Sequence, residues 1–110
     1  MTLHPDLRSD RWETMTLAEQ LGNAGADVGR AIRARESGNE ARLASNLGRA
    51  LAQLDLTLAD PRWAGHRRRE IARAREVVCD LLAGDNVYGS TPASLERWFL
   101  AYAVVARAGR

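Results

Sequence analysis

Apolar residues recur along this chain at spacings of three and four, in four segments that fill nearly everything after residue 15. That spacing places them on one face of an α-helix, because a helix turns once every 3.6 residues. No segment shows the strict alternation that is typical of a strand. Short polar connections between the segments favour antiparallel neighbours. The pattern predicts an all-α protein, an antiparallel up-down-up-down four-helix bundle.

Start and stop signals bound each predicted helix. Thr16 and Glu19 form a capping-box pattern, Asn39 can cap the second helix, and Thr91 can cap the fourth. Pro61 stops the second helix, because the residue before a proline avoids the helical region. The expected helices cover residues 16–36, 40–60, 66–83 and 92–108, the last ended by Gly109. Residues 1–15 are expected to be a lead-in that docks Leu3, Leu7 or Trp12, and residues 16–110 form one domain.

Each predicted helix has one apolar face that we expect to form the core. The expected faces are Leu17, Leu21, Ala24, Val28 and Ala31 or Ile32 in the first helix; Ala44, Leu47, Leu51, Leu54 and Leu58 in the second; Ile71, Ala74, Val78 and Leu81 in the third; and Leu95, Trp98, Phe99, Tyr102, Val105 and Ala106 in the fourth.

Two further features of these helices are candidate interfaces. Gly22, Gly25 and Gly29 lie inside the first helix, where each glycine costs about 1 kcal/mol relative to alanine. The expected gain is the close approach of another backbone, from a bundle neighbour or from another subunit; the alternative is a weak, bent helix. Trp98 and Tyr102 fill the core or lie at a subunit interface, where aromatic residues are enriched.

The overall composition is that of a soluble globular domain, with 45% hydrophobic and 27% charged residues in 110. No apolar run approaches the roughly 20 residues of a membrane-spanning helix. The N-terminal residues lack the pattern of a secretory signal. We therefore expect a cytoplasmic protein without a membrane partner. The single cysteine, Cys79, is expected to be a buried thiol.

Basic residues are concentrated in one segment. Residues 62–75 contain six arginines and one glutamate and so carry +5, whereas the whole chain carries +2 and the remainder therefore −3. Three of the arginines fall in the first turn of the third helix, where the helix dipole disfavours cations and unpaired amides can bind anions. One interpretation is contact with nucleic-acid phosphate or an acidic protein face; the other is a solvated face whose arginines pair with nearby acids. The candidate nucleic-acid-binding residues are Arg62, Trp63, His66, Arg67, Arg68, Arg69 and Arg73.

All 16 basic residues are arginine. Codon usage in a GC-rich genome is the favoured explanation, and selection for bidentate phosphate or carboxylate binding is the alternative, so the positions of the arginines are more informative than their number.

The side chains needed for catalysis are scarce. Two histidines and one cysteine are too few and too scattered for a zinc site. His66 is the only plausible base, and Cys79 is 13 residues away in the same helix, which is too far for direct contact. No glycine-rich phosphate loop lies between a strand and a helix. We therefore expect no metal, no cofactor and no enzymatic activity.

Five short motifs carry a resemblance: LAEQLGN at 17–23, LDLT at 54–57, DPRW at 60–63, REVVCD at 75–80 and YGSTP at 88–92. Over residues 15–103 the chain resembles a group of small uncharacterised prokaryotic proteins, a likeness that implies no activity. Its size, four helices and basic surface more loosely resemble the accessory variability determinant of diversity-generating retroelements and the ribosomal intervening-sequence proteins. That second likeness implies a ring-forming homo-oligomer that binds RNA and a reverse transcriptase.

Two functions follow as alternatives. The first is a non-enzymatic RNA-binding adaptor that is expected to be a homo-oligomer. The resemblance to the retroelement proteins implies that such an adaptor would act as a reverse-transcriptase accessory protein. The second is a protein-interaction or oligomerisation module that uses the aromatic and glycine faces without binding nucleic acid.

Overall fold

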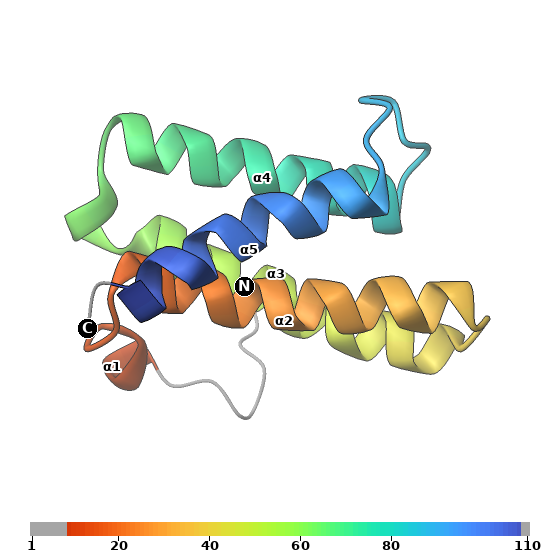
Figure 1. The fold of residues 1–110 in the computed structure, drawn as a ribbon, viewed down its shortest axis with the longest axis horizontal. Helices are drawn as coiled ribbons and strands as arrows, with labels where there is room; N and C mark the ends of the chain where they lie inside the picture. Colours follow the sequence, from red (N-terminus) through yellow and green to blue (C-terminus); the bar gives the residue numbers. More distant parts are fainter. Residues whose placement is uncertain (1–8, 109–110) are drawn as a thin grey trace.

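The fold is all-α, and four of its helices pack antiparallel as a bundle (Figure 1). The computed structural model describes residues 9–108. Its helices are α1 (Ser9–Trp12), α2 (Leu17–Glu36), α3 (Glu40–Ala59), the 3₁₀ turn η1 (Pro61–Trp63), α4 (His66–Leu82) and α5 (Pro92–Ala108). This confirms the predicted fold class, with the short helix α1 in the lead-in before the bundle. Leu3, Leu7 and Gly109 lie outside the described residues.

Helix α2 is the centre of the packing. It forms a long antiparallel hairpin with α3, and α5 crosses its other side (Figure 1). Helix α4 packs less extensively, against α3, α2 and α5. The arrangement therefore contains two close helix pairs that share α2.

The predicted helix starts are confirmed in the structure. Thr16 accepts a hydrogen bond from the Glu19 amide, and the Glu19 carboxylate accepts one from the Thr16 amide, which completes the capping box. The Asn39 side chain accepts a hydrogen bond from the Arg42 amide, and the Thr91 hydroxyl accepts one from the Ser94 amide. These side chains satisfy amides that the helices themselves leave unpaired.

The buried faces of α2 and α4 agree with the prediction, whereas two other faces do not. On α3 the buried residues are Ala50, Ala52, Gln53, Leu54 and Thr57. Of the predicted α3 face, Leu54 is buried, Leu47, Leu51 and Leu58 are half-buried, and Ala44 is exposed. The periodicity counted only apolar residues, but α3 turns a face with two polar side chains toward α2 and α1, where each finds a hydrogen-bond partner.

The prediction for α5 is wrong at its C-terminal end. Leu95 and Phe99 are buried and Trp98 and Tyr102 are half-buried, but Val105 is 60% exposed. The side chain of Ala106 lies outside the described part of the chain. Cys79 is also half-buried rather than buried, with its sulfur 3.8 Å from a guanidinium nitrogen of Arg75.

Gly25 marks the close contact between α2 and α5. A Cβ built on Gly25 would lie 2.5 Å from the Phe99 Cβ, which real Cβ atoms do not tolerate. A Cβ on Gly22 would lie 3.5 Å from the Ala103 Cβ, and one on Gly29 would meet only the guanidinium of Arg33. Among the three glycines, Gly25 therefore permits close packing of a neighbouring helix in the same chain.

We expect Gly25→Ala to lower the free energy of unfolding by about 1–3 kcal/mol, because the added methyl group forces Phe99 or the α5 backbone to move. Gly48→Ala is the matched control, since Gly48 is an exposed glycine inside α3 with no atom within 4 Å of the added Cβ. That control should stabilise the protein by about 0.5–1 kcal/mol. Urea unfolding of both variants measures the difference, and equal effects would contradict the close contact.

Candidate functional site

The arginine-rich segment begins at a buried carboxylate. Asp60 ends α3 and is only 5% exposed. Its carboxylate accepts hydrogen bonds from the Arg62 amide at 3.0 Å and from the Arg62 guanidinium, which approaches to 2.6 Å. The side-chain hydrogen bond from Arg62 is the main cause that lowers the pKa of Asp60 from 3.8 to about 2, against the opposing effect of burial. The same pairing raises the pKa of Arg62.

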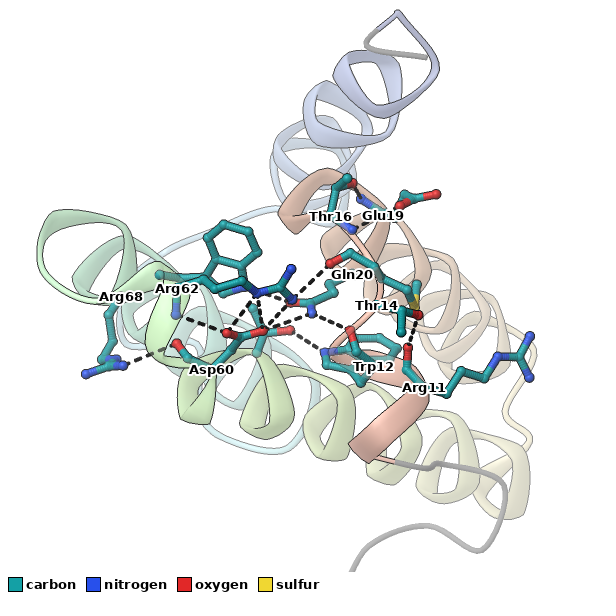
Figure 2. A network of polar contacts seen from close by, with 12 residues as sticks. Arg11, Trp12, Thr14, Thr16, Glu19, Gln20, Asp60, Arg62 and Arg68 are labelled. Atoms are coloured by element: carbon teal, nitrogen blue, oxygen red, sulfur yellow. Dashed lines mark hydrogen bonds and ion pairs between the residues drawn. The ribbon is translucent and has the colours of Figure 1, made fainter.

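Gln20 connects this ion pair to the N-terminal segment (Figure 2). The Gln20 side-chain amide donates to the Trp12 carbonyl at 2.8 Å and to Asp60 at 3.4 Å. Its carbonyl oxygen accepts a hydrogen bond from the Trp63 indole at 3.0 Å. Because Gln20 is fully buried, these partners replace the water it would otherwise bind.

Two further contacts close the arrangement. The Trp12 indole donates to the Thr57 hydroxyl at 3.0 Å, and the Arg62 guanidinium donates to the Met15 carbonyl at 3.0 Å. The side chains in this arrangement, which we call the Asp60 network, are Trp12, Gln20, Thr57, Asp60, Arg62 and Trp63. It ties the N-terminal segment, the start of α2 and the end of α3 together, and it confirms that Trp12 docks on the bundle.

Several of the candidate nucleic-acid-binding residues thus have internal partners. Arg62 and Trp63 belong to the Asp60 network, and the guanidinium of Arg62 also lies 4.5 Å from the centroid of the Trp63 ring. Half-buried Arg68 donates to the Asp60 carbonyl at 3.3 Å. Arg75, in the same segment, forms an ion pair with Asp55 at 2.7 Å, which raises the pKa of Arg75.

The other candidates lie on the surface of α4. The side chains of exposed Arg67 and Arg69 have no hydrogen bond or ion pair with any described residue. His66 lies 3.6 Å from Glu70, and the Arg73 guanidinium lies 4.8 Å from the centroid of the Tyr88 ring.

These surface residues do not share one face of α4. Helical spacing puts His66, Arg69 and Arg73 together on the outward side. Arg67 lies on the side toward α5. Burial, and secondarily Glu70, raises the pKa of Tyr102 on α5, and the charge of Arg67 opposes this rise. The structure therefore divides the exposed arginines of this segment between two surfaces.

The start of α4 differs from those of α2 and α3. Its N-cap is Gly65, with φ +86°, which has no side chain to bond the first amides, and the first turn contains no acidic residue. The amides of this turn and the arginines beside it leave positive potential that an anion can reach.

A second surface lies between α2 and α5. A groove of about 630 Å³ opens there, and we call it the α2–α5 groove. Its apolar lining includes Phe99, Leu100 and Ala103, and its charged lining residues are Arg30, Arg33, Glu96 and Arg97. Of the predicted interface residues, Gly22, Gly25 and Gly29 line this groove, whereas Trp98 and Tyr102 pack against the core.

The outer surface of α5 carries apolar side chains that the sequence analysis missed. Leu100 is 56% exposed and Val104 is 49% exposed, one turn apart on the same face. The signal was present in the sequence, because α5 is apolar almost all round and such a helix cannot bury every side in a small bundle.

Among residues 9–108, no three histidine, cysteine, aspartate or glutamate side chains come together as a metal site. None of the described helices is long and apolar enough to cross a bilayer. Comparison with known proteins found no match to this chain among family models, curated proteins or solved structures.

We expect Asp60 to make stability depend on pH in acid. Because its pKa is lowered from 3.8 to about 2 by folding, it contributes about 2 kcal/mol above pH 4. That contribution is lost as the pH falls from 4 to 2. The difference in free energy of unfolding between the wild type and Asp60→Asn, measured by urea titration at several pH values, should shrink over this interval. A constant difference would contradict the ion pair, and Arg62→Gln should flatten the dependence.

Proposed function

We propose that this protein is a non-enzymatic adaptor that binds a partner protein through the outer face of α5 and the adjoining α2–α5 groove. The observation that carries the proposal is the exposure of Leu100 and Val104 on one face of α5, beside the groove. Each of these side chains is already about half buried, so its complete burial would contribute roughly half of the 1.5–3 kcal/mol expected for a fully exposed aliphatic side chain. Val105 adds a third exposed aliphatic side chain nearby.

The use of arginines within the fold also favours this function. Arg62 and Arg75 neutralise Asp60 and Asp55, and Arg68 donates to a backbone carbonyl. On the surface of α4, Glu70 lies 3.6 Å from His66 and adds one negative charge among the exposed arginines. The high positive charge that residues 62–75 show in the sequence is therefore much reduced at the surface.

A nucleic-acid-binding adaptor is the second candidate. The uncapped start of α4 supports it, because exposed Arg67 and Arg69 flank unpaired amides. In that case RNA would bind through its phosphate groups. The loose likeness to the retroelement accessory proteins would then imply a reverse transcriptase as a protein partner and a homo-oligomeric state.

For the leading proposal, the test is the double variant Leu100→Asp, Val104→Asp. The probe is a displayed library of fragments from the proteins encoded by neighbouring genes. Fragments that bind the wild-type protein are selected and identified. Calorimetry then measures their affinity for the wild-type protein and for the double variant. We expect at least a tenfold loss of affinity in the double variant, because two buried aliphatic contacts are replaced by charges.

The matched control is Val87→Asp, since Val87 is 83% exposed but lies in the loop before α5. It should leave binding unchanged. Equal losses in both variants, or none in either, would contradict the proposal. Light scattering on the free protein shows whether a second copy is the partner, in which case the double variant should lower the measured mass.

The second candidate makes a separate prediction about salt. Arg67→Ala, Arg69→Ala should weaken binding to a generic structured RNA and reduce the slope of log affinity against log salt by roughly 1.4–1.8, the value for two lost phosphate contacts. Filter binding at several salt concentrations measures this slope. Arg42→Ala, Arg107→Ala removes the same charge from exposed sites on other helices and should alter the slope less. Equal slopes in the two variants would show that α4 is not the RNA-binding surface.

A further inference from the structure

The α2–α5 groove forms where the two helices diverge. At Gly25 the helices are in close contact through Phe99. One turn further along α2, at Gly29, a built Cβ would have no atom of α5 within 4 Å. The side chains that line the widening gap from α5 are Ala93, Glu96, Arg97 and Leu100. The result is a trough with an apolar floor that lies open to solvent.

The rim of the groove is basic. Arg30 and Arg33 come from α2 and Arg97 from α5, and Glu96 is the one acidic side chain among the described residues that line the groove. Arg30 is paired with buried Asp27 at 2.8 Å. Arg33 and Arg97 have no ion pair with any described residue, so their charge is available to a ligand.

We propose that the α2–α5 groove binds an amphipathic helix of a partner protein, with a small or apolar face on the floor and acidic residues along its edges. This inference rests on the proposed protein-binding function and names the class of partner. The acidic edges would pair with Arg33 and Arg97, while the apolar face covers the exposed side chains of Leu100 and Ala26.

The chemistry of the groove favours a helix over an extended peptide. Helices α2 and α5 use their backbone amides and carbonyls internally, so they offer no edge to which a strand could add. A gap between two helices accepts the ridge of side chains of a third helix. From Gly22 to Arg33 the α2 wall extends roughly 17 Å, about three helical turns.

The charge of the rim selects an acidic partner. Two copies of this chain that met groove to groove would bring arginines against arginines, and the chain carries +2 overall. Nucleic acid matches the rim but not the floor, because the one aromatic side chain there, Phe99, is buried and offers no ring for base stacking. An acidic amphipathic helix satisfies both the floor and the rim.

A charge-swap selection tests this inference. The probe is a displayed library of 14-residue amphipathic helices with alanine and leucine on one face and either glutamate or lysine at the flanking positions. The wild-type protein should enrich glutamate-flanked helices. Arg33→Glu, Arg97→Glu should reverse the preference to lysine, and affinity for the glutamate-flanked helices should fall at least tenfold.

The matched control, Arg69→Glu, Arg73→Glu, reverses the same number of charges on the outward face of α4 and should keep the preference for glutamate. Circular dichroism checks that each variant is folded. If the charge-reversed variant does not fold, the neutral variant Arg33→Gln, Arg97→Gln replaces it and should abolish the preference for glutamate-flanked helices. No enrichment on the wild type, or an unchanged preference in the reversed or neutral variant, would overturn the inference. So would competition by RNA or dimerisation through this groove.

The two proposals can fail separately. If partner fragments bind in a manner that depends on Leu100 and Val104 but is indifferent to Arg33 and Arg97, then the protein-binding function stands and the acidic helix does not. If binding is indifferent to all four residues, both proposals are wrong.

Discussion

A carboxylate removed from water must find compensating partners, and the arrangement of one end of this bundle follows from how Asp60 does so. Its partner Arg62 is two residues away, so the chain must turn sharply after α3 and form η1. That turn places Trp63 against Gln20 of α2, and Gln20 in turn holds the carbonyl of Trp12. Removing one partner of such a pair leaves a buried charge, which is strongly unfavourable.

The Asp60 network also changes the interpretation of the basic segment. Arg62 and Trp63 look like a cation and a stacking surface for nucleic acid when only their spacing is known. In the structure, their polar groups hold the N-terminal segment to the bundle. Exposed Arg67 and Arg69 on α4 and exposed Arg33 and Arg97 beside the α2–α5 groove form no ion pair with a described residue.

The asymmetry of the bundle explains why the α2–α5 groove exists. Phe99 requires the absence of a side chain at Gly25, and α5 also stays close to α2 at Gly22, where Ala103 approaches, but not at Gly29. Because α5 crosses α2 at an angle, the helices separate on one side of the contact (Figure 1). Since α4 covers little of α5, Leu100 and Val104 remain on the surface. The features that suggest partner binding thus come from the crossing geometry.

Local signals in the sequence determined the helices and most of their core. Capping by Thr16, Asn39 and Thr91 depends on residues three positions apart, and the faces of α2 and α4 follow from periodicity alone. Only the tertiary structure decided which face of α3 is buried, because Gln53 and Thr57 become core residues through partners distant in sequence, Asp27 and Trp12. The same reason applies to the candidate sites. Whether an arginine is an internal ion-pair partner or a free cation depends on which acids the fold brings to it, and periodicity carries no information about that.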